Sequence, residues 1–218
     1  MTSFPGAPQV LKGGFVVMDG EGKKVERVVS FQYNPDALTR ALAPRGAKTE
    51  MGDRLEGLRL TGMPVETLKL DVEFDATDRL EKPLGNKDAV ENGIASELAT
   101  LETLIAPRVA DTAQAQALAD RGTLEILPLP SPLILLVLGR NRLLPVRITD
   151  FSIIEEAFDP RLNPIRARVS LGMRVLSTED LAWGTKGAEL FRAAQSRREK
   201  LADARKTLVQ ALGLSGTP

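Results

Sequence analysis

The sequence predicts an α+β protein built on an antiparallel sheet, and three observations support this prediction. Several segments alternate apolar and polar residues with a period of two, the pattern of strands that bury one face. Turn signals separate neighbouring strand segments, as hairpins require. The helical segments are grouped between strands and at the C-terminus, instead of following every strand, which disfavours a parallel βαβ arrangement.

The composition limits the functions that this chain can have. Its 218 residues include no cysteine and no histidine, and 29 Lys and Arg balance 29 Asp and Glu. Thiolate metal sites, cysteine nucleophiles and histidine-based catalysis are therefore excluded. The zero net charge gives no global attraction to nucleic acid or anionic lipid. We expect a protein that is not an enzyme and has no catalytic residue, cofactor, metal or small-molecule substrate.

The N-terminal residues lack the basic region and the long apolar segment of a signal peptide. The most apolar run, 133–138, has six residues, whereas a helix that crosses a bilayer needs about 20. We therefore expect synthesis in the cytoplasm and no membrane insertion.

The first elements are expected to be strands. A hairpin is predicted with strands over 14–19 and 25–33, because Asp19-Gly20 supplies the positive φ of a tight turn. The segment 42–63 is rich in Gly, Arg and Glu without a clear period, which indicates an exposed loop. The segment ETLKLDVEF, 66–74, then alternates regularly, so one face should be buried and the other wet.

The second strand ends in the sequence FQYNPD. Asn34-Pro35 stops the strand, because proline lacks an N–H and restricts the residue before it. Alternation predicts that Phe31 and Tyr33 share one inward face, with Gln32 opposite.

Helices are expected next. A helix is predicted over 89–105, where apolar residues recur at spacings of three and four, and an alanine-rich helix is predicted over 110–120. The remaining helix lies in the C-terminal extension, 177–218, where Ser177 and Asp180 have the spacing of a helix start. Its narrow apolar stripe, near heptad spacing and suited to docking on another surface, includes Leu201 and Leu208.

The late strands have the clearest patterns. A wholly apolar strand over 133–138 should be covered on both faces, and 139–141 forms its turn. The return strand, 145–157, changes its apolar face near Thr149-Asp150, which predicts a bulge. The strand over 165–175 alternates throughout and would be roughly 35 Å long, a length typical of curved sheets or barrels.

Two groups of charged residues are candidate sites. Glu155, Glu156 and Asp159 are close in sequence, but no histidine or second acidic motif accompanies them, which favours a solvated strand end over an acid–base or metal site. Arg166, Arg168 and Arg174 share one strand face. This row is either an ordinary exposed face or a surface that lines a partner or a channel, and no motif indicates binding of nucleotides or of specific nucleic acid.

Four segments in order resemble the tube-type proteins of contractile injection systems, the phage-tail-like particles of bacteria, including tube initiators and tube–baseplate adaptors. The segments are FQYNPD, LDVEFD, LPLPSPLILLVLG and PIRA, and the resemblance covers 14–176. The family often has tryptophan where this chain has Leu138, and glycine where it has Asn163. The matching residues are Phe31, Tyr33, Asn34, Pro35, Phe74, Asp75, Gly139, Pro164, Arg166 and Ala167.

The resemblance implies a fold. It implies an antiparallel β-barrel or sandwich of the phage tail-tube type over 1–176, with a flanking helix at 89–105, followed by the amphipathic C-terminal helix of 177–218. Some adaptors of the family end in a LysM module, and we find none here.

The resemblance also implies a function. Such a protein is a structural component that forms a six-fold ring in the inner tube or at the tube–baseplate junction. Its partners are copies of itself and neighbouring tube, baseplate and spike proteins, and it is assembled in the bacterial cytoplasm into a particle. The polar strand face would border the lumen, which makes Arg166, Arg168 and Arg174 lumen candidates, and the loop 42–63 would reach a neighbour.

The residues alone also permit a different class of protein. A cytoplasmic adaptor or binding domain could dock a single partner through its C-terminal amphipathic helix, with Leu201 and Leu208 in the interface.

Overall fold

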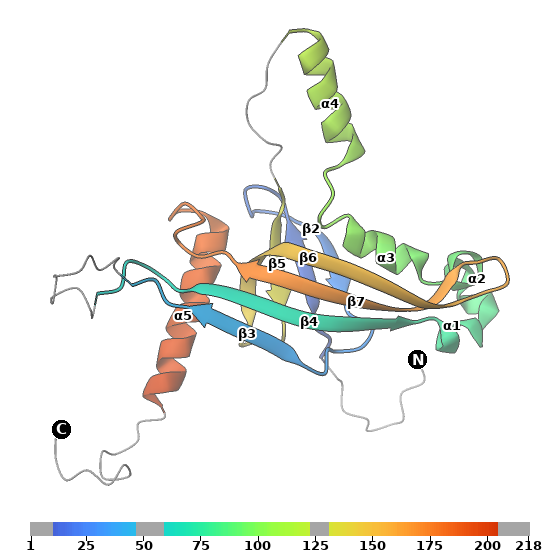
Figure 1. Ribbon diagram of the computed structural model, residues 1–218, viewed down its shortest axis with the longest axis horizontal. Coiled ribbons are helices and arrows are strands. Elements are labelled where there is room, and N and C mark those ends of the chain that lie inside the picture. The colour runs from blue at the N-terminus through green and yellow to red at the C-terminus, as the bar shows by residue number, and fades with distance from the viewer. Residues whose placement is uncertain (1–10, 47–58, 123–130, 205–218) are drawn as a thin grey trace.

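The computed structural model describes residues 11–46, 59–122 and 131–204, and this part of the chain is α+β. Its strands form one antiparallel sheet in the order β2-β1-β5-β6-β7-β4-β3 (Figure 1). The α+β class predicted from the sequence is confirmed. The strands are β1 (Gly14–Met18), β2 (Val25–Ser30), β3 (Leu38–Ala43), β4 (Val65–Asp75), β5 (Leu133–Val137), β6 (Leu143–Phe158) and β7 (Pro164–Val175).

The sheet is open, not a closed barrel. Strands β2 and β3 are its two edges and do not pair with each other. The long strand β6 pairs with β5 through its first residues and with β7 through the rest. Its register shifts between Ile148 and Asp150, so the bulge predicted near Thr149-Asp150 is confirmed. The bulge bends β6 and lets the two halves of the sheet face each other.

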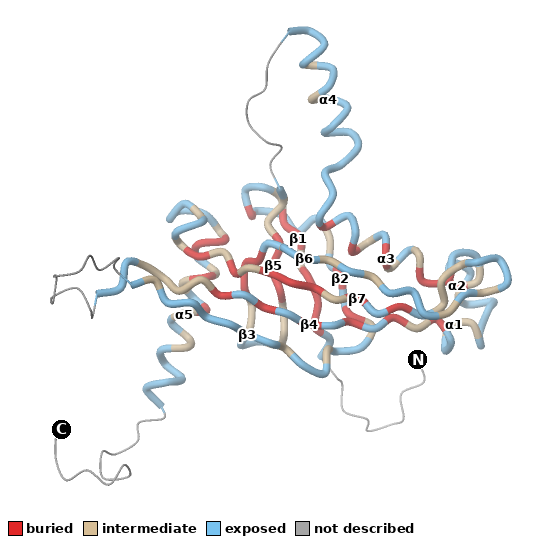
Figure 2. The backbone as a smooth tube through the Cα atoms, in the orientation of Figure 1, coloured by how far each residue is buried: buried red, intermediate tan, exposed pale blue. Residues whose placement is uncertain are grey.

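The two halves of the sheet share one core. Phe15 of β1 and Leu136 of β5 belong to the same buried cluster as Leu68 of β4 and Leu171 of β7. Figure 2 shows buried and exposed positions alternating along β4, as the sequence predicted for 66–74. The apolar strand β5 has three consecutive buried residues, which confirms that both of its faces are covered.

The single helix predicted over 89–105 is wrong. The chain breaks at Gly93, which has a φ of +63°, and the N–H of Ile94 donates to the carbonyl of Pro164 at 2.8 Å. This bond to the β6–β7 hairpin competes with helix continuation, and only glycine fits because a Cβ would lie 2.0 Å from that carbonyl oxygen. The helical elements are α1 (Thr77–Leu80), the 3₁₀ turn η1 (Pro83–Gly85), α2 (Lys87–Asn92), α3 (Ala95–Glu102), α4 (Val109–Asp120) and α5 (Lys186–Asp203).

The remaining helices differ in how they meet the core. Helix α4 confirms the prediction over 110–120 to within one residue, and it projects from the body without a buried residue (Figure 1). The helix start predicted at Ser177 is wrong: 177–180 is a turn in which the Asp180 carboxylate accepts from the amide of Ser177 at 3.0 Å. Helix α5 starts at Lys186 and buries Phe191 in the core.

Strand β3 is absent from the predictions. Its residues are exposed apart from the half-buried Leu38, so an edge strand leaves no alternation to detect. The loop predicted over 42–63 begins within β3, and Gly46 forms an isolated bridge with Leu60. Positions 47–58 of that loop lie outside the described residues, as does Leu208.

The two aromatic residues of FQYNPD do not share a face. Phe31 is fully buried and meets Phe15 edge to face, with ring centroids 5.4 Å apart. Tyr33 is 47% exposed, so the expected common inward face is wrong. Strand β2 ends at Ser30, and the alternation of an extended strand therefore stops before Tyr33.

We expect Phe31→Ala to lower the free energy of unfolding by about 3–5 kcal/mol, because it leaves a cavity beside Phe15. The matched variant Tyr33→Ala, in the same motif, should change it by about 1 kcal/mol or less. Urea unfolding followed by circular dichroism measures both. Equal losses for the two variants would contradict the burial of Phe31 and the exposure of Tyr33.

Candidate functional site: the polar face of the sheet

Strands β3, β4, β7 and β6 together present one polar surface, which we call the polar face. It lies opposite the core, since Leu68, Leu70 and Val72 of β4 point to the core and the residues between them point away. Register places Asp71 beside Ser170 and Ser170 beside Ser152. Apart from the exposed Ile154, which lies beside Arg168, the polar face comprises Thr39, Thr67, Lys69, Asp71, Glu73, Asp75, Arg147, Asp150, Ser152, Arg166, Arg168, Ser170, Gly172 and Arg174.

The predicted arginine row lies on this face, but its charges are paired within the chain. Arg168 donates to Glu73 across the β4–β7 pair at 2.9 Å, and Arg174 pairs with Asp180 at 2.6 Å. The hydrogen bond from Arg168 to Glu73 raises the pKa of that guanidinium. Ion pairs of this kind hold long side chains in place and balance the charges of the arginine row.

Asp75 joins three segments at one end of the polar face. Its carboxylate accepts from Arg166 at 2.8 Å and from the amide of Thr77 at 2.7 Å. Burial opposes ionisation of this group, but the hydroxyl and amide of Thr77 and then Arg166 outweigh it, and the pKa of Asp75 is lowered. The same bond raises the pKa of Arg166.

The main chain of Asp75 is paired with the side chain of Gln32. The Gln32 amide donates to the Asp75 carbonyl at 2.6 Å, and the Asp75 N–H donates to the Gln32 carbonyl oxygen at 3.0 Å. The Gln32 carboxamide therefore makes the two hydrogen bonds that a neighbouring strand residue would make. It joins FQYNPD to the end of LDVEFD. Sequence reasoning missed this role; the position of Gln32 between two motif aromatics was the available signal.

The sequence predicted only that Asn34-Pro35 stops a strand, but the Asn34 side chain also binds the main chain before β1. Its side-chain oxygen accepts from the amide of Gly13 at 2.8 Å, and its side-chain nitrogen donates to the carbonyl of Leu11 at 2.8 Å. Asn34 thus fastens the segment that leads into β1, while Pro35 next to it is half-buried.

The other residues of the resemblance lie in the hairpins and the core. Gly139 occupies the β5–β6 turn with a φ of +72°, and Pro164 starts β7. Phe74 and Ala167 are a buried cross-strand pair. These four residues support the fold and do not reach the polar face.

The acidic trio does not come together as a site. Asp159 stabilises the turn after β6, because its carboxylate accepts from the main-chain amides of Arg161 at 2.7 Å and Asn163 at 2.8 Å. The amide of Asn163 is the main reason that the pKa of Asp159 is lowered. Glu155 and Glu156 are exposed on β6. Among the described residues no three His, Cys, Asp or Glu side chains are placed to hold a metal ion.

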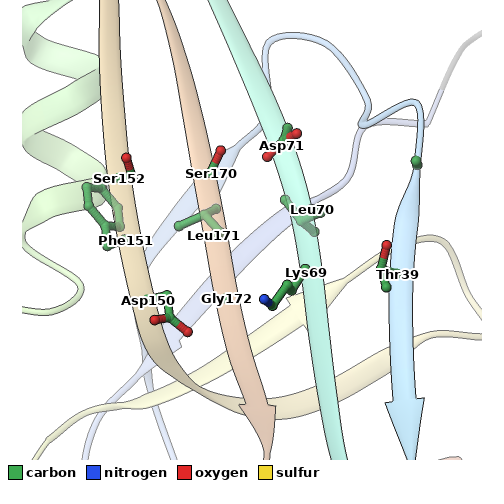
Figure 3. A pocket seen from close by; sticks show the side chains of 11 residues that line it. Thr39, Lys69, Leu70, Asp71, Asp150, Phe151, Ser152, Ser170, Leu171 and Gly172 are labelled. Carbon is green, nitrogen blue, oxygen red and sulfur yellow. The ribbon is translucent and has the colours of Figure 1, made fainter.

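The polar face contains a shallow basin of about 450 Å³ (Figure 3). Lys69 lies in it with Asp71 on the same strand and Asp150 two strands away, and Ser152 and Ser170 extend it. Gly172 separates Lys69 from Asp150, and a Cβ there would lie 2.6 Å from the Asp150 carboxylate. The basin offers mixed charges and hydroxyl groups, and it brings no activated nucleophile next to a base.

No protein-family model matches this sequence, and no curated protein matches it significantly. Within the described ranges, the helices are too short or too polar to cross a membrane.

The lowered pKa of Asp75 predicts a pH-dependent stability. The ionised carboxylate stabilises the fold above its ordinary pKa of 3.8, and this contribution is lost as the pH falls through the lower folded-state pKa. Asp75→Asn should therefore lower the thermal midpoint near neutral pH, and its difference from the wild type should shrink in acid below pH 3.8.

Thermal unfolding at a series of pH values measures this difference. Asp71→Asn is the matched control, because Asp71 lies on the same strand face and its carboxylate makes no hydrogen bond or ion pair with the described residues. A difference for Asp75→Asn that persists unchanged in acid would contradict the assignment.

Proposed function

We propose that this protein is a non-enzymatic structural subunit of a contractile phage-tail-like injection particle. It forms a six-fold ring in the inner tube or at the tube–baseplate junction. The observation that carries the proposal is the polar face, in which four adjoining strands turn an ion-paired, wet surface outward while their other surface is the core. Such a two-sided wall suits the lining of a channel.

The open edges of the sheet support assembly into a ring. Strands β2 and β3 end the sheet, and apolar side chains on both are exposed, with Val28 at 63% and Leu42 at 49%. Unpaired edges of this kind favour pairing with another chain. When the edge of one copy lies against its neighbour, the polar faces join into a continuous wall around the channel.

The segments that carry the family resemblance also meet in space. Gln32 of FQYNPD and Arg166 of PIRA both bind Asp75 of LDVEFD, one through its main chain and the other through its carboxylate. The apolar strand β5, from LILLVLG, pairs with β1 and β6. Asp75 and Arg166 are among the residues that carry the resemblance, and their ion pair joins two of its segments.

The same proposal covers partners and location. The rings stack on neighbouring tube, baseplate and spike proteins, are assembled in the bacterial cytoplasm, and remain part of the particle. The paired charges of Arg166, Arg168 and Arg174 give the wall a mixed-charge lining.

A second candidate is an adaptor that docks one partner through α5. The observation in its favour is exposure: Leu201 is 60% exposed, and Trp183 is 65% exposed with the Arg192 guanidinium 4.3 Å from its ring centre. Aromatic residues held in this way are common interface anchors. Because α5 also buries Phe191 in the core, deleting the helix would disturb the fold, so point variants are needed to separate the candidates.

Co-expression with neighbouring tube, sheath and baseplate genes, followed by negative-stain microscopy of the purified complex, tests the proposal. We expect rings with a central channel. A strict monomer in the presence of those partners would overturn it.

Photo-crosslinking separates the ring from the adaptor. A benzoylphenylalanine at position 41, in edge strand β3, should crosslink to a second copy of this chain at β2 in the ring. The same group at position 201, on the exposed part of α5, should capture a different protein in the adaptor. The chain has no cysteine, so the crosslinks form without disulfide background.

A further inference from the structure

Glu66 places a carboxylate in a row of core residues. Along β4 every second residue from Glu66 to Phe74 is buried, and the other members of this row are apolar. Glu66 itself is 3% exposed. A carboxylate in such a position needs partners that compensate for the hydration it has lost. Its partners therefore indicate what Glu66 holds together.

Two arginines from different elements share the Glu66 carboxylate. Arg40 of β3 donates to Oε1 from Nε at 2.9 Å and from Nη2 at 2.8 Å. Arg198 of α5 reaches both oxygens, with Nη2 3.0 Å from Oε1 and Nη1 2.8 Å from Oε2. The two guanidiniums have like charge, so the carboxylate between them is what keeps them together. We call these three residues the Glu66 cluster.

The second half of α5 depends on polar contacts of this kind. The residues that α5 buries end at Ala194, and Leu201 further along the helix is 60% exposed. Side chains that bind this half to the body are Arg197, which donates to the carbonyl of Arg140 at 2.9 Å, and Arg198 of the cluster. A helical segment that polar contacts hold without apolar burial can open locally while the core stays folded.

Edge strand β3 is also weakly held. It pairs with β4 along one edge only, and all of its residues except Leu38 are exposed. Arg40 fastens it to the cluster. Figure 1 shows α5 crossing the end of β3 and the start of β4, where the cluster lies. One buried carboxylate thus fastens two elements that are distant in sequence and that add little to the core.

We propose that the Glu66 cluster couples edge strand β3 to the second half of α5, so that a partner bound at one of them alters the other. Arg198 occupies both oxygens and fixes the orientation of the carboxylate that Arg40 binds. When α5 opens, Arg198 leaves and the carboxylate can turn to water, which weakens its bond to Arg40. Opening of β3 acts on Arg198 in the same way, because coupling between two sites is reciprocal.

Repulsion between the two guanidiniums acts in the opposite direction. The side chains of Arg40 and Arg198 are 33% and 31% exposed, whereas that of Glu66 is 4% exposed. Water therefore screens the repulsion between the arginines more than it screens their direct contacts with the carboxylate. Loss of one arginine should consequently loosen the element that carries the other.

Hydrogen–deuterium exchange of the full chain, measured by mass spectrometry, tests this coupling. Arg198→Gln changes only α5, yet it should speed exchange of the β3 amides about ten-fold. Arg40→Gln changes only β3, and it should speed exchange over 196–203 to a similar degree. Both side chains are partly exposed, so the domain should stay folded in each variant.

Arg197→Gln is the matched control. Arg197 is next to Arg198 in α5 but binds the main chain of the β5–β6 turn, and its loss leaves the cluster intact. Exchange over 196–203 should rise, while the β3 amides should stay within about two-fold of the wild type. Arg198→Lys keeps the charge without the two-pronged geometry, so it should give the pattern of Arg198→Gln more weakly.

Three results would overturn the inference. They are β3 exchange in Arg198→Gln that is unchanged or slower, β3 exchange that rises as much in Arg197→Gln, and a rise that extends equally to β1 and β7. The inference goes beyond the proposed function, because the ring contact is assigned to β3 and the adaptor contact to α5. Exchange of the free chain needs no ring, so the absence of rings beside coupled exchange would defeat the proposed function alone. Rings formed by a chain whose exchange is uncoupled would defeat the coupling alone.

Discussion

Strand β6 belongs to both halves of the sheet, and the bulge between Ile148 and Asp150 makes this possible. A flat sheet of this size would leave one apolar face in water, and the bend folds that face onto itself. Phe15 and Leu171, from opposite halves, consequently share one core. The other surface of β3, β4, β7 and β6 has nothing to bury and becomes the polar face. The bend therefore determines which face of the sheet is buried in the core and which face is exposed to solvent.

An open sheet with a bent strand must still be fastened where its halves meet without strand pairing. Gln32 does this at the end of β4, where its carboxamide pairs with both main-chain groups of Asp75. The carboxylate of Asp75 simultaneously holds Arg166. Removing a partner from such a network leaves polar groups unsatisfied, which is more harmful than the loss of an exposed ion pair. Asp75 thus links Gln32, which follows β2, to Arg166 on the polar face and to Thr77 at the start of α1.

The polar face and the turn that joins β6 to β7 are stabilised in different ways. On the polar face Arg166 and Arg168 are paired with Asp75 and Glu73 of the neighbouring strand, whereas Asp71 makes no ion pair with the described residues. The turn after β6 is instead held by local hydrogen bonds, since the Asp159 carboxylate accepts from the amides of Arg161 and Asn163.

The sequence by itself determined the antiparallel α+β class, the faces of β4 and β7 and the bulge in β6, because side-chain alternation in a strand reports directly which face is buried. It also placed Arg166, Arg168 and Arg174 on one face. Only the tertiary structure decided that these arginines are paired, that β3 exists, and that Gly93 divides the helix, since each depends on a partner distant in sequence. The same holds for Tyr33 and Gln32: the local pattern assigned them opposite faces of one strand, but β2 ends at Ser30 and the Gln32 side chain pairs with the main chain of Asp75, which is distant in sequence.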